Sequence, residues 1–130
     1  MMRMIFVNLP VKDIAVSREF FTRLGFSFNP QFSDEQTLCM VVEENICVML
    51  LQESRFRDFI NGDISDAAKT KEVLTCLSCD SREEADTLLA KALAAGATPW
   101  KPAMEAGPMY GISFQDPDGH VWEFMHMAQG

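Results

Sequence analysis

The order of the predicted elements constrains the fold most strongly, because the same order occurs twice along the 130 residues. Alternation of apolar residues with period two predicts strands, and an apolar stripe near the 3.6-residue period predicts a helix in each half. The first half predicts a strand, a helix and three strands, at residues 4–10, 14–24, 26–32, 37–42 and 46–52. The second half predicts a strand at 72–79, a helix ending at 95, and strands at 98–101, 110–115 and 121–127. The chain therefore predicts an α+β fold of two tandem βαβββ modules.

Turn and cap residues mark the ends of both predicted helices. Asp13 is a suitable N-cap for the first helix, and Gly25 follows its end. Asp80 or Ser81 caps the second helix, and Gly96 follows it. The residues predicted to face the core are Ile14, Phe20, Phe21 and Leu24 in the first helix, and Ala85, Leu88, Leu89, Ala92 and Leu93 in the second.

The segment between the modules lacks a strong period. We expect one domain over residues 1–130, with module one at about 4–52, a linking loop at 53–71 and module two at about 72–127. Phe56, Phe59 and Ile60 predict a short helix within this loop, and residues 61–71 read as a mobile segment. Such a long loop either covers a ligand site or is a solvated linker.

Composition and charge exclude several classes of protein. A hydrophobic content of 48% is typical of a globular domain. The formal charge of −8 argues against nucleic acid and anionic membrane surfaces as partners, because no basic patch would neutralise phosphates. The N-terminal residues resemble no signal peptide, and no apolar run reaches the length that crosses a bilayer. We expect a cytoplasmic protein.

The four cysteines fit the same expectation. All of them, Cys39, Cys47, Cys76 and Cys79, lie in apolar segments that predict strands, where a free cysteine packs as a small hydrophobic residue. Cys76 and Cys79 have the CxxC spacing of redox pairs and half zinc sites. Redox motifs of this kind usually open a helix, so we expect core packing instead.

The candidate for chemistry is Glu123, on the last predicted strand. A turn with the sequence Asp-Pro-Asp-Gly at residues 116–119 precedes this strand, and its Gly119 accommodates positive φ. Alternation places Glu123 on one face with Val121 and Met125, and places Trp122 on the opposite face, which we expect to pack against a helix. His120 and His126 lie three residues before and after Glu123, so neither shares its face on a strand. A carboxylate among apolar neighbours suits a general acid or base, or a group that orients a ligand.

The two modules together with these motifs resemble the vicinal oxygen chelate superfamily, which includes glyoxalases, bleomycin-binding proteins and extradiol dioxygenases. The resemblance covers residues 4–127. It rests on Val11-Lys12-Asp13, Leu24-Gly25-Phe26, Ala95-Gly96-Ala97 and Asp116-Pro117-Asp118-Gly119-His120. Segments 7–13, 28–32, 78–84 and 109–111 are similar to a branch of predicted lactoylglutathione lyases.

The resemblance implies two curved sheets that form a cleft, and a divalent metal held by ligands from the first and last strands of each module. The corresponding positions here are Phe6, Met49, Leu74 (or Thr75) and Glu123. One carboxylate does not hold a catalytic metal with useful affinity, so we expect no cofactor and no intact glyoxalase metal site. A divalent metal completed by a partner chain stays an alternative.

Two classes of function follow from this resemblance. We favour a glyoxalase/bleomycin-resistance-like protein that binds a small molecule in the cleft without a metal. The alternative is a metal-dependent lactoylglutathione lyase-like enzyme, or a related lyase or dioxygenase. Glu123 is the catalytic candidate, and the ligand-binding candidates are Phe6, Asn8, Met49, Leu74 and Tyr110. The architecture also implies a homodimer, in which the modules pair within one chain or between chains.

Overall fold

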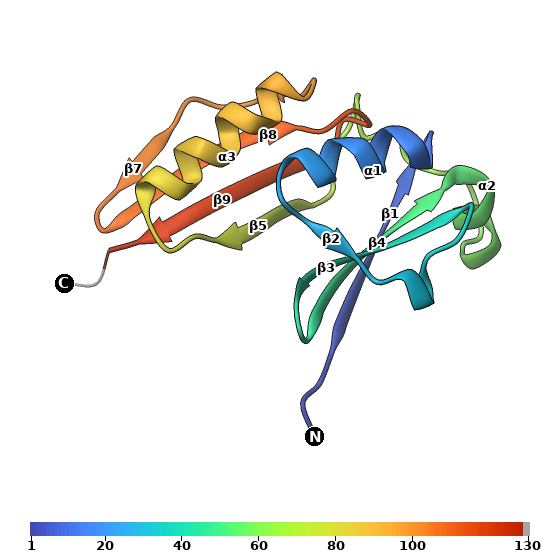
Figure 1. The fold of residues 1–130 in the computed structure, drawn as a ribbon. Coiled ribbons are helices and arrows are strands. Elements are labelled where there is room, and N and C mark those ends of the chain that lie inside the picture. Colours follow the sequence, from blue (N-terminus) through green and yellow to red (C-terminus); the bar gives the residue numbers. More distant parts are fainter. Residues whose placement is uncertain (129–130) are drawn as a thin grey trace. The chain divides into compact units, whose positions relative to one another are not determined.

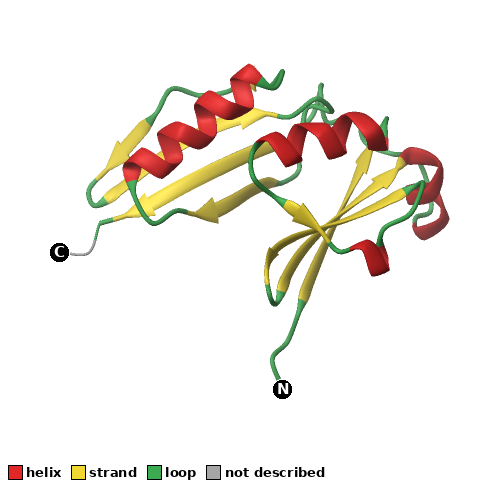
Figure 2. Ribbon diagram, in the orientation of Figure 1, coloured by secondary structure: helices red, strands yellow, loops and turns green. Residues whose placement is uncertain are grey.

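The computed structural model describes residues 1–128, which divide into two compact units, the first ending at Ser65 and the second beginning at Asp66. Each unit holds one mixed sheet with one long helix (Figures 1 and 2). The predicted α+β class and the repeat of the element order are therefore confirmed. Among the described residues, no helix is long and apolar enough to span a membrane.

The first unit contains a four-stranded sheet of order β1-β4-β3-β2. Its elements are β1 (Ile5–Val11), α1 (Ile14–Arg23), β2 (Ser27–Phe28), η1 (Pro30–Phe32), β3 (Thr37–Glu43), β4 (Ile46–Gln52), α2 (Glu53–Phe56) and η2 (Arg57–Phe59). β1 runs parallel to β4, and the other pairs are antiparallel. Parallel pairing needs a crossover, and the residues from α1 to β3 provide it.

Helix α1 begins and ends as its sequence predicts. The Asp13 carboxylate accepts hydrogen bonds from the backbone N–H of Ala15 (2.9 Å) and of Val16 (3.4 Å). Gly25 follows the helix at a φ of 101°, a conformation that glycine adopts at no steric cost. The predicted stripe of Ile14, Phe20, Phe21 and Leu24 is buried. The amphipathic pattern therefore identifies the face that packs on the sheet.

The predicted strand over residues 26–32 is wrong beyond Phe28. Pro30 has no N–H to donate to a sheet, and it opens the 3-10 turn η1. The Asn29 side chain caps that turn by accepting a hydrogen bond from the Gln31 N–H at 2.9 Å. Local capping here ends the strand after two residues.

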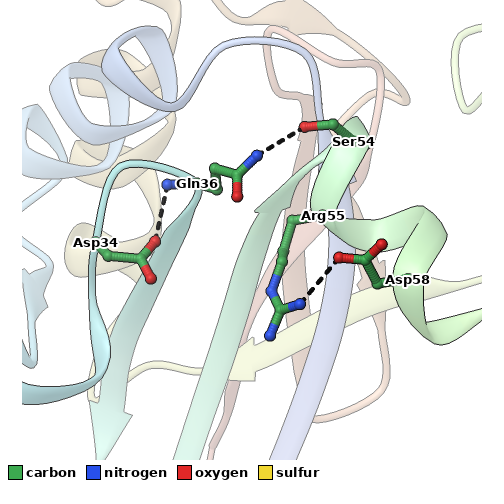
Figure 3. Close-up of polar contacts among 5 residues, drawn as sticks. All are labelled: Asp34, Gln36, Ser54, Arg55 and Asp58. Carbon is green, nitrogen blue, oxygen red and sulfur yellow. Dashed lines mark hydrogen bonds and ion pairs between the residues drawn. The ribbon is translucent and has the colours of Figure 1, made fainter.

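Polar contacts hold the segment after β4 against the beginning of β3 (Figure 3). The Gln36 amide donates to the Ser54 hydroxyl at 3.0 Å, and the Gln36 N–H donates to the Asp34 carboxylate at 2.8 Å. Within the segment, the guanidinium of Arg55 lies 2.9 Å from the carboxylate of Asp58. A short helix at this place was predicted, and α2 with η2 confirms it.

The second unit repeats the arrangement with one addition. Its elements are β5 (Leu74–Ser78), α3 (Arg82–Ala94), β6 (Thr98–Pro99), β7 (Met104–Ala106), β8 (Met109–Gln115) and β9 (Val121–Met127). The sheet order is β5-β9-β8-β6, with β5 parallel to β9, and β7 is an added short strand that pairs with β8. Figure 1 shows α3 lying along one face of this sheet. The other face carries the site described below.

Helix α3 has caps at both ends, but its predicted apolar face is only partly right. The Ser81 hydroxyl accepts from the Glu84 N–H at 3.0 Å. The Glu84 carboxylate accepts from the Asp80 N–H at 3.1 Å, so the arrangement resembles a capping box whose second bond reaches the residue before the N-cap. Ala85 and Ala92 are fully buried. Leu93 is exposed, because the stripe in contact with the sheet is narrower than the sequence pattern.

The turn before β9 is built around the buried Asp116. Its carboxylate accepts from the N–H groups of Asp118 (2.8 Å) and His120 (3.0 Å) and from the indole N–H of Trp122 (2.9 Å). Burial raises the pKa of the Asp116 carboxyl, while His120 and the Trp122 hydrogen bond act in the opposite direction. These bonds fix the start of β9, and Trp122 is fully buried on the α3 side, as predicted.

The end of the linking segment contacts the same turn. The Lys71 ammonium donates to the side-chain oxygen of Gln115 at 2.9 Å and to the backbone oxygen of Gly119 at 2.6 Å. A Cβ added at Gly119 would lie 2.8 Å from backbone atoms of Ala68. Residues 66–71 therefore lie directly against the turn.

Candidate ligand-binding site

Three functional groups lie side by side on the face of the second sheet opposite α3, which we call the Glu123 face. Glu123 on β9 is the register partner of Cys76 on β5 and of Ser113 on β8. Directly paired residues on adjacent strands share one face. A thiol, a carboxylate and a hydroxyl therefore form one row across the sheet.

Beside this row the Glu123 face is hollowed to a volume of about 90 Å³. This space is several times what one water molecule needs. The apolar part of its wall comes from Pro102, Met104, Ala106, Met109 and Met125, and its polar part from Lys101, Ser113 and Glu123. Gly111 pairs with Met104 on one side and with Met125 on the other, so the wall between these methionines carries no side chain.

The two charged residues of the hollow differ in their surroundings. Glu123 is half-buried, and within the described part of the chain no hydrogen bond or ion pair holds its carboxylate. The ammonium of Lys101 lies 5.7 Å from the centre of the Trp100 ring, and the backbone N–H of Lys101 donates to the Ser113 hydroxyl at 3.2 Å. The carboxylate is therefore free to accept a hydrogen bond or a cation from a ligand.

The pKa of the Cys76 thiol is affected by its position in this row. Burial is the main cause that raises the pKa of the Cys76 thiol, and the neighbouring Glu123 carboxylate raises it further. A raised pKa leaves less thiolate, so Cys76 is a weak nucleophile at neutral pH. Cys39, Cys47 and Cys79 are buried as predicted, but Cys76 is exposed on the Glu123 face and the prediction of core packing is wrong for it.

The site residues predicted in the first module lie on one face of their own sheet. Asn8 pairs with Met49, and Phe6 occupies the same face two residues before Asn8. The alternating residues Val7 and Leu9 point to the α1 side, where Leu9 is buried. The Asn8 amide donates to the backbone oxygen of Phe6 at 3.2 Å. The structure thus brings Phe6, Asn8 and Met49 together, and their role in ligand binding stays a prediction.

In the second module the structure groups Leu74 with Glu123 but separates Tyr110 from them. Leu74 is exposed and lies on the Glu123 face, two residues before Cys76. Tyr110 points to the α3 side, where its hydroxyl donates to Asp86. This hydrogen bond is the main cause that raises the pKa of Tyr110, followed by burial and the Asp86 charge, while Arg82 acts in the opposite direction.

The hollow itself combines residues that the sequence pattern named with others that it missed. Glu123 was named from the sequence, and Met104, Met109 and Met125 suit an adaptable apolar lining because methionine fills irregular spaces. Gly111, Ser113 and Lys101 were not singled out. Period-two alternation along β8 places Gly111 and Ser113 on the same face as Met109. Only the β8–β9 register shows that this face is also the face of Glu123.

The donor set does not fit the divalent metal that the superfamily resemblance implies. Phe6 and Leu74 carry no donor atom, and Met49 offers a soft thioether that suits neither Ni²⁺ nor Zn²⁺ beside one carboxylate. Within residues 1–128, no three His, Cys, Asp or Glu side chains come close enough to hold a metal ion. The histidines do not extend the site, because His126 points to the α3 side and contacts the backbone oxygen of Cys79 at 3.1 Å.

Comparison with known proteins agrees with this fold. Residues 3–43 match the family described as bleomycin resistance protein-like N-terminal. No curated protein matches the chain significantly in sequence. Solved structures match in fold: a hypothetical protein from S. aureus has a TM-score of 0.81 and is 27% identical, over 97% of this chain and 95% of that one.

Two further solved structures share the fold at lower identity. A glyoxalase/bleomycin resistance protein/dioxygenase family enzyme from Burkholderia phytofirmans is 20% identical, with a TM-score of 0.79, over 97% of this chain and 99% of that one. The fosfomycin resistance protein FosX from Listeria monocytogenes is 17% identical, with a TM-score of 0.68, over 97% and 93%. These likenesses show the fold.

The fold is the two-module α+β fold of the glyoxalase/bleomycin resistance type. This fold and the match of residues 3–43 to the bleomycin resistance protein-like N-terminal family make the chain similar to proteins of the vicinal oxygen chelate superfamily. The fold implied by the resemblance found in the sequence is thereby confirmed. Its lactoylglutathione lyase-like branch stays a prediction.

Proposed function

We propose that this protein binds a small, partly apolar molecule in the hollow of the Glu123 face, and that binding needs no metal. The observation that carries the proposal is a carboxylate at the edge of a methionine-lined hollow that makes no hydrogen bond or ion pair with the described residues. Ligand sites typically combine an apolar wall with a few polar groups that fix orientation. Here Glu123 and Ser113 supply the polar groups.

The methionines support binding of a molecule rather than simple packing of the sheet. Met104 is exposed, and Met109 and Met125 are half-buried, so their side chains border open space. Unbranched thioether side chains adapt to ligands of different shape at little cost. The related proteins reported as resistance proteins and glyoxalase-family enzymes also favour a small-molecule role for this chain.

Catalysis is the second candidate, because Glu123 could move a proton on a bound ligand. The donor set argues against a metal-dependent lyase, so the binding role takes precedence. An intact lyase would show turnover of a methylglyoxal–glutathione adduct that depends on added Ni²⁺ or Zn²⁺. We expect no such turnover and no stoichiometric metal in the purified protein.

The test of binding uses the methionines as reporters. Protein labelled with ¹³C at the methionine methyl groups is titrated with a library of neutral, cationic and anionic fragments in the presence of a chelator. We expect fragments that shift the signals of Met104, Met109 and Met125 and leave that of Met40 unchanged, because Met40 is fully buried in the first unit. A library without any such fragment would overturn the proposal.

A blocked variant gives the matched control. A Cβ at Gly111 would lie 3.8 Å from the Phe124 oxygen and 3.9 Å from the Met125 methyl carbon, which are ordinary contacts. Gly111→Ala should therefore fold normally. Gly111→Val extends further into the hollow and should abolish the fragment-induced shifts while the thermal unfolding midpoint stays close to that of Gly111→Ala. Shifts that persist in Gly111→Val would place the fragments elsewhere.

A further inference from the structure

We propose that the ligand is an organic cation, which places a protonated amine or quaternary ammonium group on Glu123 and its apolar part over Gly111. This inference rests on the proposed function and names the chemical class that the same hollow selects. Its basis is the difference between the two charged residues of the hollow, together with the shape of the wall between Met104 and Met125.

The first step concerns the charge that a ligand meets. Glu123 projects from the middle of β9 and makes no hydrogen bond or ion pair with any described residue. The other charged residue, Lys101, follows β6 at the rim and lies with its ammonium against Trp100. No ion pair joins Lys101 to Glu123 among the described side chains. The charge that the sheet face itself presents to a ligand, in the row with Cys76 and Ser113, is therefore that of the Glu123 carboxylate.

The second step concerns the neighbours of that charge. The row beside Glu123 consists of a thiol and a hydroxyl, and neither brings a positive charge. The Glu123 carboxylate, next to burial, raises the pKa of the Cys76 thiol, its register partner in this row. A hydrogen bond between an ammonium group and a carboxylate is roughly twice as strong as one between neutral groups. A cationic donor thus binds the Glu123 carboxylate more strongly than a neutral donor does, and the same carboxylate repels an anion.

The third step concerns the body of the ligand. Glu123 and Met125 are two residues apart on one face of β9, and Gly111 pairs with Met125. A cation held at Glu123 therefore has its carbon substituents above Gly111, between two thioethers. Polarisable sulfur atoms contact both alkyl and aromatic groups favourably. A small inorganic cation such as Na⁺ would gain nothing from this wall, so the proposal is limited to organic cations.

The test uses three probes of one shape and different charge: benzylammonium, benzyl alcohol and benzoate. Each is titrated up to 20-fold above its apparent Kd where solubility permits, with the Met104, Met109 and Met125 methyl signals as the readout. We expect benzylammonium to bind about ten-fold more tightly than benzyl alcohol, which corresponds to about 1.4 kcal/mol, and benzoate to bind most weakly. Added salt should weaken benzylammonium and leave benzyl alcohol unchanged.

Two variants test whether the Glu123 carboxylate causes the preference for the cationic probe. Glu123→Gln should reduce the preference for benzylammonium over benzyl alcohol to about one. Glu83→Gln changes the net charge by the same amount, but Glu83 lies exposed in the first turn of α3, on the other side of the sheet. The preference should survive in Glu83→Gln. An equal loss of this preference in Glu123→Gln and Glu83→Gln would overturn the inference. The preference would then depend on the net charge of the protein and not on the position of Glu123.

The outcomes separate this inference from the proposed function. If benzyl alcohol and benzylammonium bind equally to the wild type, and both are lost in Gly111→Val, the hollow is a ligand site and its selectivity for cations is refuted. If none of the three probes and no library fragment shifts the three methionine signals, both proposals fail. Tighter binding of benzoate than of benzylammonium would assign the selectivity to Lys101 and would also refute the cation.

Discussion

Glu123 and Cys76 are direct register partners on parallel strands. Burial raises the pKa of the Cys76 thiol, and the Glu123 carboxylate raises it further. The two side chains share the face of the sheet that carries the hollow. A cysteine beside the proposed anchor is therefore a built-in reporter of the charge at Glu123. It allows the electrostatics of the site to be measured before any ligand is known.

The first prediction follows from this pair. Removing the charge in Glu123→Gln should lower the pKa of Cys76, because a neighbouring negative charge disfavours the thiolate. More thiolate is then present at a given pH below the wild-type pKa, so iodoacetamide should alkylate Cys76 faster at pH 8. Mass spectrometry of the modified peptide measures the rate at Cys76, with the buried Cys79 as the internal control. Unchanged rates from pH 7 to 9 would show that Glu123 does not act on the thiol.

The second prediction concerns Tyr110, the one tyrosine of the sequence. Its hydroxyl donates to Asp86 and so favours the neutral phenol, which raises the pKa of Tyr110. Asp86→Asn removes the charge and weakens the hydrogen bond, so the pKa of Tyr110 should fall towards its ordinary value. An ultraviolet difference titration follows this tyrosine without interference from another. An unshifted titration in Asp86→Asn would mean that Tyr110 does not point to α3.

Tyr110 also shows where sequence reasoning reached its limit at the site. Strand periodicity correctly separated Glu123 from Trp122 and from His126, because alternation within one strand is a local property. Which residues of β8 share the Glu123 face depends on the pairing of Ser113 with Glu123, which no local pattern specifies. Tyr110 was therefore grouped with the ligand candidates although its side chain turns to α3.

The fold was more predictable than the site, because its signals are short in range. Asp13, Ser81 and the two glycines that follow the helices mark helix ends by their own conformational preferences. The errors at the site lie where long-range strand pairing decides the arrangement. Strand β7 (Met104–Ala106) has only three residues and forms by pairing with β8, so a local pattern gives little signal for it. The hollow depends on this strand, and it could not be predicted for the same reason.

The third prediction tests the contact between the linking segment and the Asp-Pro-Asp-Gly turn. Gly119→Ala should lower the free energy of unfolding by about 1–2 kcal/mol for a left-handed backbone and by about 1–3 kcal/mol more for the approach to Ala68. Gly96→Ala is the matched control, since Gly96 has a φ of 107° and no atom within 4 Å of an added Cβ. Gly96→Ala should lose only the free energy that belongs to the left-handed backbone, about 1–2 kcal/mol.

Urea unfolding curves of the two glycine variants measure the difference. The excess loss in Gly119→Ala isolates the close approach of residue 68 to the turn, because the second unit contains both glycines. Lys71→Met should show a further, smaller loss, since the ammonium of Lys71 joins Gln115 to the backbone of Gly119. Equal losses in Gly119→Ala and Gly96→Ala would mean that residues 66–71 do not pack against the turn in solution.

The most direct test of the central claim is a crystal structure of the protein soaked with benzylammonium in the presence of a chelator. The account predicts an ammonium nitrogen within hydrogen-bond distance of a Glu123 carboxylate oxygen and a ring over Gly111 between Met104 and Met125. A metal ion coordinated by Glu123 in crystals grown without chelator, with the hollow unable to hold any organic probe, would contradict it.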